Sequence, residues 1–364
     1  MDPLLYFPLY LTLIGVLCTI TAFRYIGSSS YSLQEEQQPF ITPLLLCIFL
    51  VIWLGYRPAH YIFGDTVNYA FGYRRLVPGI IAIDWNKEWV WEWITMTCKS
   101  LNLSVEAYFM VAEVGYILSV LWAVKKFTPI NPLLGILFVI SSLMFYTFGV
   151  NGVRNGLACH LTLLGMAFAF ENKYISCFIV YLIAFGIHRS VALPITAFIV
   201  GYLFKNKVKY ALFIWFLSIP LSLVFGGSAI ALFTSLGFDD RMNNYTDANN
   251  DMSIFSSTGF RWDFLLYSFF PTLMIWYICI KRKIVDYWYN VLAITYCLCN
   301  AFWIMVITAE YSNRFAYLSW FMYPIIIAYP LINLPVWEDQ DRKTGFILLA
   351  YCGFTLFMEL VFWG

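Results

Sequence analysis

The sequence predicts an all-α protein that crosses a membrane many times. Hydrophobic residues make up 61% of its 364 residues and charged residues 12%, whereas soluble domains have roughly 45–50% and 25%. The mean hydropathy of +0.73 indicates the same class. Apolar runs recur along the whole chain with short polar segments between them. We therefore expect one integral membrane domain over residues 1–364, and the net charge of +1 gives no indication of nucleic-acid binding.

About twelve apolar segments are predicted to form transmembrane or partly spanning helices. A full span needs about 20 apolar residues, so the three segments between 153 and 204 are short. Short spans are tolerated where they border a water-filled cavity inside the protein. The predicted helices are 4–23, 41–56, 105–124, 130–150, 153–170, 174–187, 190–204, 209–226, 262–280, 287–308, 315–336 and 344–363.

Lysine-rich short segments assign the cytoplasmic ends of these helices, because cytoplasmic loops of membrane proteins carry an excess of Lys and Arg. They are Lys125-Lys126, Lys173, Lys205 to Lys209, Lys281 to Lys283 and Arg342-Lys343. The resulting topology places both termini outside. It also predicts a first large extracytoplasmic loop at 57–104 and a second at 227–261.

Arginine is concentrated on the outer side of this topology. A guanidinium is planar and always charged, and it clamps phosphate oxygens in a bidentate manner. The outer arginines therefore predict an anionic, phosphate-bearing ligand, although structural ion pairs with Asp65, Asp84, Asp263 or Glu310 are the alternative. The outer arginines are Arg57, Arg74, Arg75, Arg154, Arg189, Arg241, Arg261 and Arg314.

The first outer loop contains a tryptophan-rich segment. Trp85, Trp89 and Trp93 recur every four residues, which predicts one face of an amphipathic helix, with Glu88 and Glu92 beside them. One interpretation is a helix that lies at the membrane interface. The other is a sugar platform, because flat rings stack on pyranoses and carboxylates bind hydroxyls.

Some polar or small residues fall inside the predicted spans. Glu113 lies mid-span, where a charge is costly, and its role is left open. His160 is expected to be a hydrogen-bonded packing residue. The pair Gly152 and Gly156 is typical of close helix packing.

Short polar motifs occur in a fixed order at the ends of the apolar segments. This ordered set covers nearly the whole chain and resembles the EpsG family of Wzy-like polysaccharide polymerases. The motifs are Arg57 followed by Gly64-Asp-Thr-x-x-Tyr69, then Asn151-Gly-Val-Arg154, Gly186-Ile-His-Arg-Ser190, Arg261 and Ser312-Asn-Arg-Phe315.

The resemblance implies a GT-C-like glycosyltransferase of the bacterial inner membrane. Such enzymes join undecaprenyl-diphosphate-linked oligosaccharide repeat units on the periplasmic or outer side, in exopolysaccharide, capsule or O-antigen biosynthesis. The partners that the resemblance implies for this chain are the lipid-linked oligosaccharide, membrane lipids, and a chain-length regulator and a flippase of the same pathway. No cofactor is expected. The sequence shows no His/Asp metal pattern, so we predict a metal-independent reaction with no metal ligands.

Glycosyl transfer requires a base near the acceptor hydroxyl and cations on the departing diphosphate. Asp65 is the first candidate for the base and His188 the second, since imidazole titrates near neutral pH. His188 could also be only a residue at the end of a short helix. The predicted diphosphate ligands are Arg57, Arg154, Arg189, Arg261 and Arg314, and the predicted glycan-binding residues are Tyr69, Trp85, Trp89, Glu92 and Trp93.

Three other functions remain open at the level of sequence. A lipid-linked oligosaccharide flippase also needs outer arginines, but inverted repeats and polar sites on both faces are expected of it. A glycan ligase of the outer leaflet performs the same chemistry on another acceptor. A membrane O-acyltransferase would need an intramembrane histidine such as His160 or His188.

Overall fold

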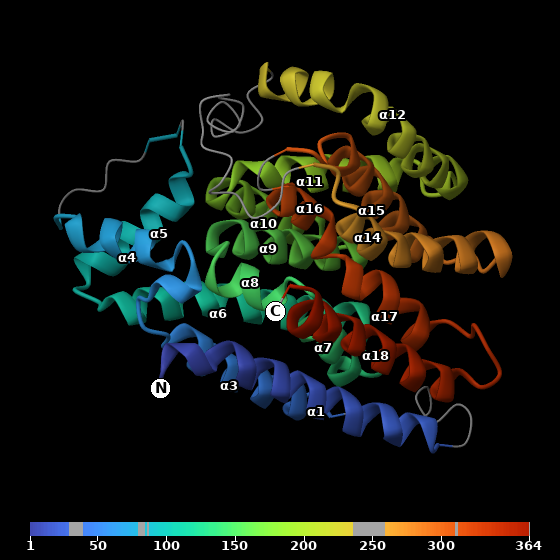
Figure 1. The fold of residues 1–364 in the computed structure, drawn as a ribbon, viewed down its shortest axis with the longest axis horizontal. Helices are drawn as coiled ribbons and strands as arrows, with labels where there is room; N and C mark the ends of the chain where they lie inside the picture. The colour runs from blue at the N-terminus through green and yellow to red at the C-terminus, as the bar shows by residue number, and fades with distance from the viewer. Residues whose placement is uncertain (29–38, 79–83, 86, 236–258, 310–311, 364) are drawn as a thin grey trace. The chain divides into compact units, whose positions relative to one another are not determined.

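The computed structural model describes residues 1–28, 39–78, 84–85, 87–235, 259–309 and 312–363. Every regular element within these ranges is helical (Figure 1). Eight of these helices are long and apolar enough to cross a membrane, and shorter apolar helices accompany them. The chain is therefore a multi-pass, all-α membrane protein, as the sequence predicts.

The contacts divide the chain into two compact units. Unit 1 comprises residues 1–188 and 327–364, and unit 2 comprises residues 189–326. The helices of unit 1 are α1 (Tyr6–Ile26), α3 (Ile41–Gly55), α4 (Thr66–Arg75), α5 (Trp89–Ser100), α6 (Val105–Phe127), α7 (Pro132–Ile140), α8 (Phe145–Val150), α9 (Val153–Phe170), α10 (Tyr174–Ile187) and α18 (Gln340–Phe357), while α17 (Tyr323–Asn333) begins in unit 2 and ends in unit 1.

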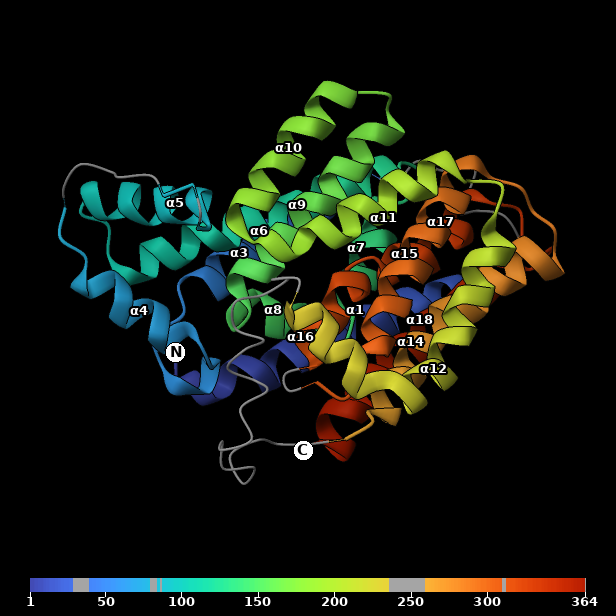
Figure 2. The same cartoon turned by 90° about the horizontal axis from the view of Figure 1, so that it is seen from above.

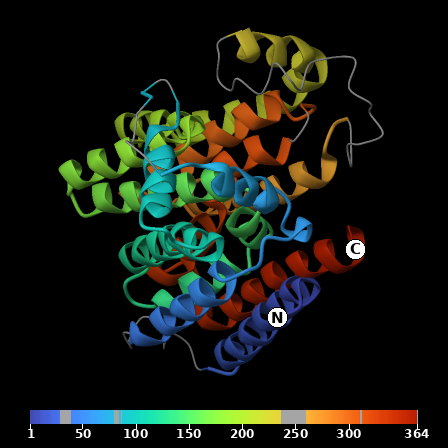
Figure 3. The same ribbon diagram turned by 90° about the vertical axis from the view of Figure 1, so that its left-hand side faces the viewer.

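The first and last long helices of unit 1 lie side by side. Figure 3 shows α1 along α18. Gly345 permits this approach, because a Cβ added there would lie 2.6 Å from the carbonyl oxygen of Ala22. A glycine at a helix contact lets two backbones come close, so this pairing brings the two ends of unit 1 together.

Helix α9 packs against both α6 and α10 (Figure 1). A Cβ added at Gly156 would lie 3.0 Å from the Tyr116 ring, so the predicted close packing is confirmed at this glycine. His160 is buried, its Nδ1 lies 2.9 Å from the Tyr116 carbonyl oxygen, and its ring stacks on the Tyr116 ring at 4.0 Å. The prediction that His160 is a hydrogen-bonded packing residue is also confirmed.

The segment predicted as one helix over 130–150 is interrupted, and this expectation is wrong. Helix α7 ends at Ile140 and α8 begins at Phe145. The Ser141 hydroxyl donates to the Leu137 carbonyl at 2.6 Å, and the Ser142 hydroxyl donates to the Val139 carbonyl at 2.7 Å. Such local bonds compete with the helical ladder, and the break turns the chain toward the start of α9.

Unit 2 is built around α15 (Tyr287–Met305), which contacts α11 (Ala192–Leu203), α12 (Val208–Ser235), α14 (Trp262–Ile275) and α16 (Ser312–Trp320). The buried Asn300 amide accepts from Trp215 Nε1 at 2.7 Å and donates to Ser268 Oγ at 3.1 Å and Ser319 Oγ at 2.8 Å. A fully bonded polar group inside an apolar core fixes how the helices align.

The second predicted outer loop, 227–261, overlaps a helix. Helix α12 continues to Ser235, past the expected end at 226. Most of the rest of that loop, including the Asp239–Asp251 stretch and Arg241, lies outside the described residues.

Candidate functional site

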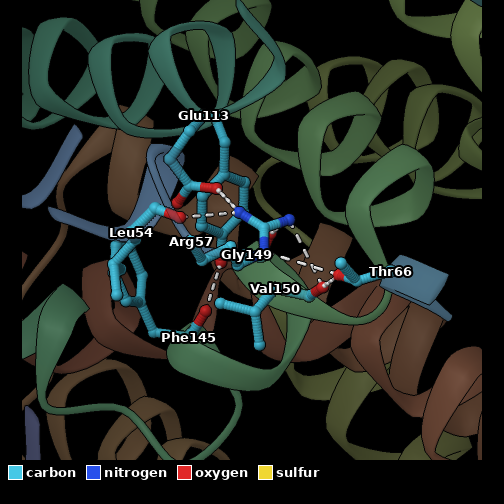
Figure 4. Close-up of polar contacts among 8 residues, drawn as sticks. Leu54, Arg57, Thr66, Glu113, Phe145, Gly149 and Val150 are labelled. Atoms are coloured by element: carbon cyan, nitrogen blue, oxygen red, sulfur yellow. Dashed lines mark hydrogen bonds and ion pairs between the residues drawn. The ribbon is translucent and has the colours of Figure 1, made fainter. Parts of the chain in front are cut away.

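The start of the segment predicted as the first outer loop folds back into unit 1 at Arg57, directly after α3. Its Nη1 donates to the Leu54 carbonyl at 2.8 Å and lies 3.3 Å from Glu113 Oε2. Its Nε donates to the Thr66 hydroxyl at 3.4 Å. Its Nη2 donates to the carbonyls of Gly149 at 3.5 Å and Val150 at 3.4 Å, and Figure 4 shows all five bonds.

The side chains of Arg57 and Glu113 are both 0% exposed. A guanidinium has five N–H donors, and here protein acceptors take five hydrogen bonds from it. A phosphate contact by Arg57, as predicted from the sequence, would require this buried pair to open. In the structure Arg57 fixes the loop onto α6 and α8, and Glu113, whose role the sequence left open, neutralises it.

The Gly64-Asp-Thr motif docks on the residues that precede α9. The Thr66 hydroxyl donates to the Val150 carbonyl at 2.5 Å, and the Asp65 backbone N–H donates to Asn151 Oδ1 at 2.8 Å. Gly64 has a φ of +60°, and a Cβ added there would lie 2.5 Å from the Asn151 side chain. Both observations require glycine. The Asp65 carboxylate is half-exposed and accepts from Asn68 Nδ2 at 3.3 Å.

Tyr69 of α4 and Arg154 in the first turn of α9 also contact each other. Arg154 Nε donates to the Tyr69 hydroxyl at 3.0 Å, and the guanidinium lies 5.5 Å from the centre of the Tyr69 ring. Arg154 Nη1 also donates to Glu88 Oε2, and both of these side chains are 19% exposed. Arg154 is thus held from two sides while part of it still reaches solvent.

Glu88 also reaches the end of α10. Its Oε1 lies 3.7 Å from Nε2 of His188, the residue that follows α10. Because α9 begins where α10 ends, the two helices deliver Arg154 and His188 to the same end of unit 1. We call Tyr69, Glu88, Arg154 and His188 the Glu88 cluster.

The expectation that Trp85, Trp89 and Trp93 share one helical face is wrong for Trp85, whereas Trp89 and Trp93 lie one turn apart in α5. Helix α5 starts at Trp89, and Trp85 lies in the turn before it. Glu88 has non-helical backbone angles (φ −80°, ψ 68°), which separates the two segments. The rings of Trp85 and Trp89 still lie 5.0 Å apart, and Trp85 and Trp93 are exposed.

Trp89 closes against the end of α10, where a Cβ added at Gly186 would lie 2.7 Å from its ring. Figure 2 shows α5 beside α10, in agreement with the contacts between them. Trp91 points the other way, with its ring centre 5.7 Å from that of Tyr69 and 5.8 Å from that of Tyr108. The half-buried Glu92 lies one turn after Glu88. Helix α5 therefore packs Trp91 against Tyr69 of the Glu88 cluster, while Trp93, one turn after Trp89, stays exposed.

Three predicted diphosphate ligands belong to unit 2. Arg261 donates from Nε at 2.9 Å and Nη2 at 2.6 Å to the two carboxylate oxygens of Asp263, so the predicted alternative of an ion pair with Asp263 is confirmed for this arginine. Arg189 follows the end of α10, and Arg314 is half-buried in the first turn of α16. Convergence of these three with Arg154 stays a prediction.

Within the described ranges, no group of three or more His, Cys, Asp or Glu side chains is arranged to hold a metal ion. The sequence does contain one Asp-x-Asp tripeptide, at Asp339-Gln340-Asp341. Asp339 pairs with Lys343 at 2.6 Å, and Asp341 accepts from the Ser28 hydroxyl at 3.2 Å. This tripeptide lies at the helix end that the topology assigns to the cytoplasm.

The EpsG family model matches residues 42–364, which includes every residue of the Glu88 cluster and of the Arg57 contacts. The chain belongs to the EpsG family. EpsG proteins are associated with exopolysaccharide biosynthesis, and this member is a multi-pass membrane protein. No curated protein and no solved structure matches the chain significantly.

The structure of this EpsG protein adds two residues that the sequence did not assign to the site. Glu113 and Glu88 are the carboxylate partners of Arg57 and Arg154, two arginines that the sequence predicts to lie on the outer side. Glu113 is signalled in the sequence only by its position inside an apolar span. Glu88 is signalled only by its place among tryptophans, where a sugar-binding role is equally consistent with the pattern.

Proposed function

We propose that this EpsG protein is a polysaccharide polymerase of the bacterial inner membrane with its site on the outer face. It transfers a growing glycan from undecaprenyl diphosphate to a hydroxyl of another lipid-linked repeat unit. Membership of the EpsG family supports a role in exopolysaccharide biosynthesis. The hydrogen bonding of Arg154 supports the transfer of a glycan from a diphosphate.

The main support for this proposal is Arg154, because protein acceptors fix its guanidinium but use only some of its N–H donors. The Tyr69 hydroxyl and the Glu88 carboxylate accept from Nε and Nη1, and no other described residue accepts from it. Its remaining N–H donors lie on a side chain that is 19% exposed, in the first turn of α9. A guanidinium with open donors at a helix N-terminus favours a phosphate ligand.

In the proposed reaction, the bond between the anomeric carbon and the diphosphate oxygen breaks, and the oxygen keeps the electron pair. The acceptor hydroxyl forms the new bond to the anomeric carbon and gives its proton to a base. Arg154 stabilises the charge on the leaving diphosphate. His188 belongs to the same side, because Glu88 ties it to Arg154.

Asp65 is the proposed base. It precedes Tyr69 by one turn of α4, a spacing that separates Cβ atoms by about 5–6 Å. The Asp65 carboxylate therefore lies one helical turn from Tyr69 of the Glu88 cluster. Arg189, Arg261 and Arg314 are proposed as further diphosphate ligands, with Asp263 exchanging for phosphate at Arg261. Tyr69, Trp85, Trp89, Glu92 and Trp93 are proposed to bind the glycan.

The test is a single-turnover assay with purified lipid-linked donor and acceptor repeat units. Asp65→Asn keeps the shape of the side chain and removes its basicity, so it is expected to abolish nearly all turnover while the donor still binds. His188→Gln is expected to reduce turnover only in part. If His188→Gln has no turnover and Asp65→Asn keeps most of it, the imidazole is the base. Substantial turnover in both variants would contradict the site.

A further inference from the structure

Glu88 touches two residues of the proposed reaction with different oxygens. Oε2 accepts from Arg154 Nη1, and Oε1 lies 3.7 Å from His188 Nε2. The carboxylate is 19% exposed, so water screens these contacts only in part. Its backbone leaves the helical region immediately before α5, which directs this one side chain toward the ends of α9 and α10.

The Glu88 carboxylate offsets the repulsion between two neighbouring cationic groups. Arg154 is always cationic, and His188 carries a positive charge whenever its imidazole is protonated. Two such groups at adjacent helix ends repel one another unless an anion lies between them. Glu88 provides that anion from a third segment of the chain, which neither α9 nor α10 could supply from its own sequence.

We propose that Glu88 is a positioning residue that holds Arg154 and His188 in one cradle for the leaving diphosphate. The proposal rests on the proposed function, since it assigns Glu88 no contact with the reacting atoms. Glu88 acts through its length as well as its charge. Gln keeps the length and loses the charge, whereas Asp keeps the charge but is one methylene shorter and cannot reach both partners.

The experiment compares Glu88→Gln and Glu88→Asp with Asp84→Asn, a control from the same loop. Asp84 pairs with Lys87 at 3.6 Å, so this control removes an equal charge from the same loop at a different ion pair. Each Glu88 variant is expected to lower turnover by about tenfold or more, the typical loss for a hydrogen bond between charged groups. Each is also expected to weaken equilibrium binding of undecaprenyl diphosphate, whereas Asp84→Asn matches the wild type in both measurements.

A double-mutant cycle separates positioning from a general structural role. If Glu88 acts through Arg154, Glu88→Gln costs much less turnover in an Arg154→Lys background than in the wild type. Full additivity, or wild-type turnover in Glu88→Gln, overturns the proposal. The wild-type chain is measured in the same assay. If the wild-type chain forms no polymer, the proposed function is refuted, and so is the role proposed for Glu88.

Discussion

Arg57 and Arg154, both in unit 1, have the same predicted role but differ in burial and in hydrogen bonding. The sequence predicts that both bind diphosphate from the outer face. Arg57 is 0% exposed and makes five hydrogen bonds to protein acceptors. Arg154 makes two and is 19% exposed. Either guanidinium could bind phosphate by its chemistry. Only Arg154 keeps N–H donors that protein acceptors do not use.

The largest effect is expected from breaking the buried pair. Arg57→Ala leaves the Glu113 carboxylate inside the protein without its cation, which typically destabilises a protein by about 3–5 kcal/mol. We expect a strongly lowered unfolding temperature in detergent and little folded protein. A double variant with Arg57→Met and Glu113→Leu removes both charges and is expected to recover part of that stability. A double variant no more stable than Arg57→Ala would show that the unpaired charge is not the cause.

An intermediate effect, on activity alone, is expected at Arg154. Arg154→Lys keeps the positive charge but loses the planar fork that contacts Tyr69 and Glu88 and that is proposed to bind the diphosphate. Polymer formation by purified protein is expected to fall by roughly tenfold or more, with an unfolding temperature close to that of the wild type. Arg57→Lys, the matched change, should lower the unfolding temperature instead. If the two lysine variants behave alike, the contrast between these arginines is wrong.

The smallest effect is expected from the exposed face of α5. Trp93→Leu keeps an exposed apolar side chain and removes the flat ring. If Trp93 binds glycan, mean polymer length is expected to fall, with a loss of binding of about 2- to 10-fold. Trp122→Leu is the control, because Trp122 is also exposed but lies in α6, near the lysines assigned to the cytoplasm. Equal polymer lengths in the two variants would favour an anchoring role for Trp93.

Local patterns predicted the helices well where the chain carries clear stop signals. Helices α9 and α10 have the bounds expected from the sequence, and Asn172, with a φ of +61°, makes the turn between them. The four-residue spacing of Trp85 and Trp89 predicts a helix that includes Trp85, but the same spacing also occurs in a turn, and α5 begins only at Trp89. Ser141 and Ser142 carried the signal for the break before α8, but serine also occurs within helices.

The partners of the arginines could not be predicted, for a different reason. Glu113 is 56 residues from Arg57, and Glu88 is 66 residues from Arg154. Neither separation carries a helical or turn periodicity, so the sequence offers several carboxylates for each guanidinium. Arg261 is the exception, because Asp263 lies two residues away and could be named as a partner in advance.

The separation between Arg57 and its acceptors also bears on how the protein is made. During synthesis Arg57 emerges before Glu113, and the acceptor carbonyls of Gly149 and Val150 follow 92 and 93 residues after it. At roughly 5–20 residues per second, the arginine waits about 5–20 s for its last acceptors. A permanently charged group cannot wait in lipid at low cost. The segment after α3 must therefore stay in the insertion machinery or at the membrane interface until α6 and α8 arrive, which makes the burial of Arg57 a late step in biogenesis.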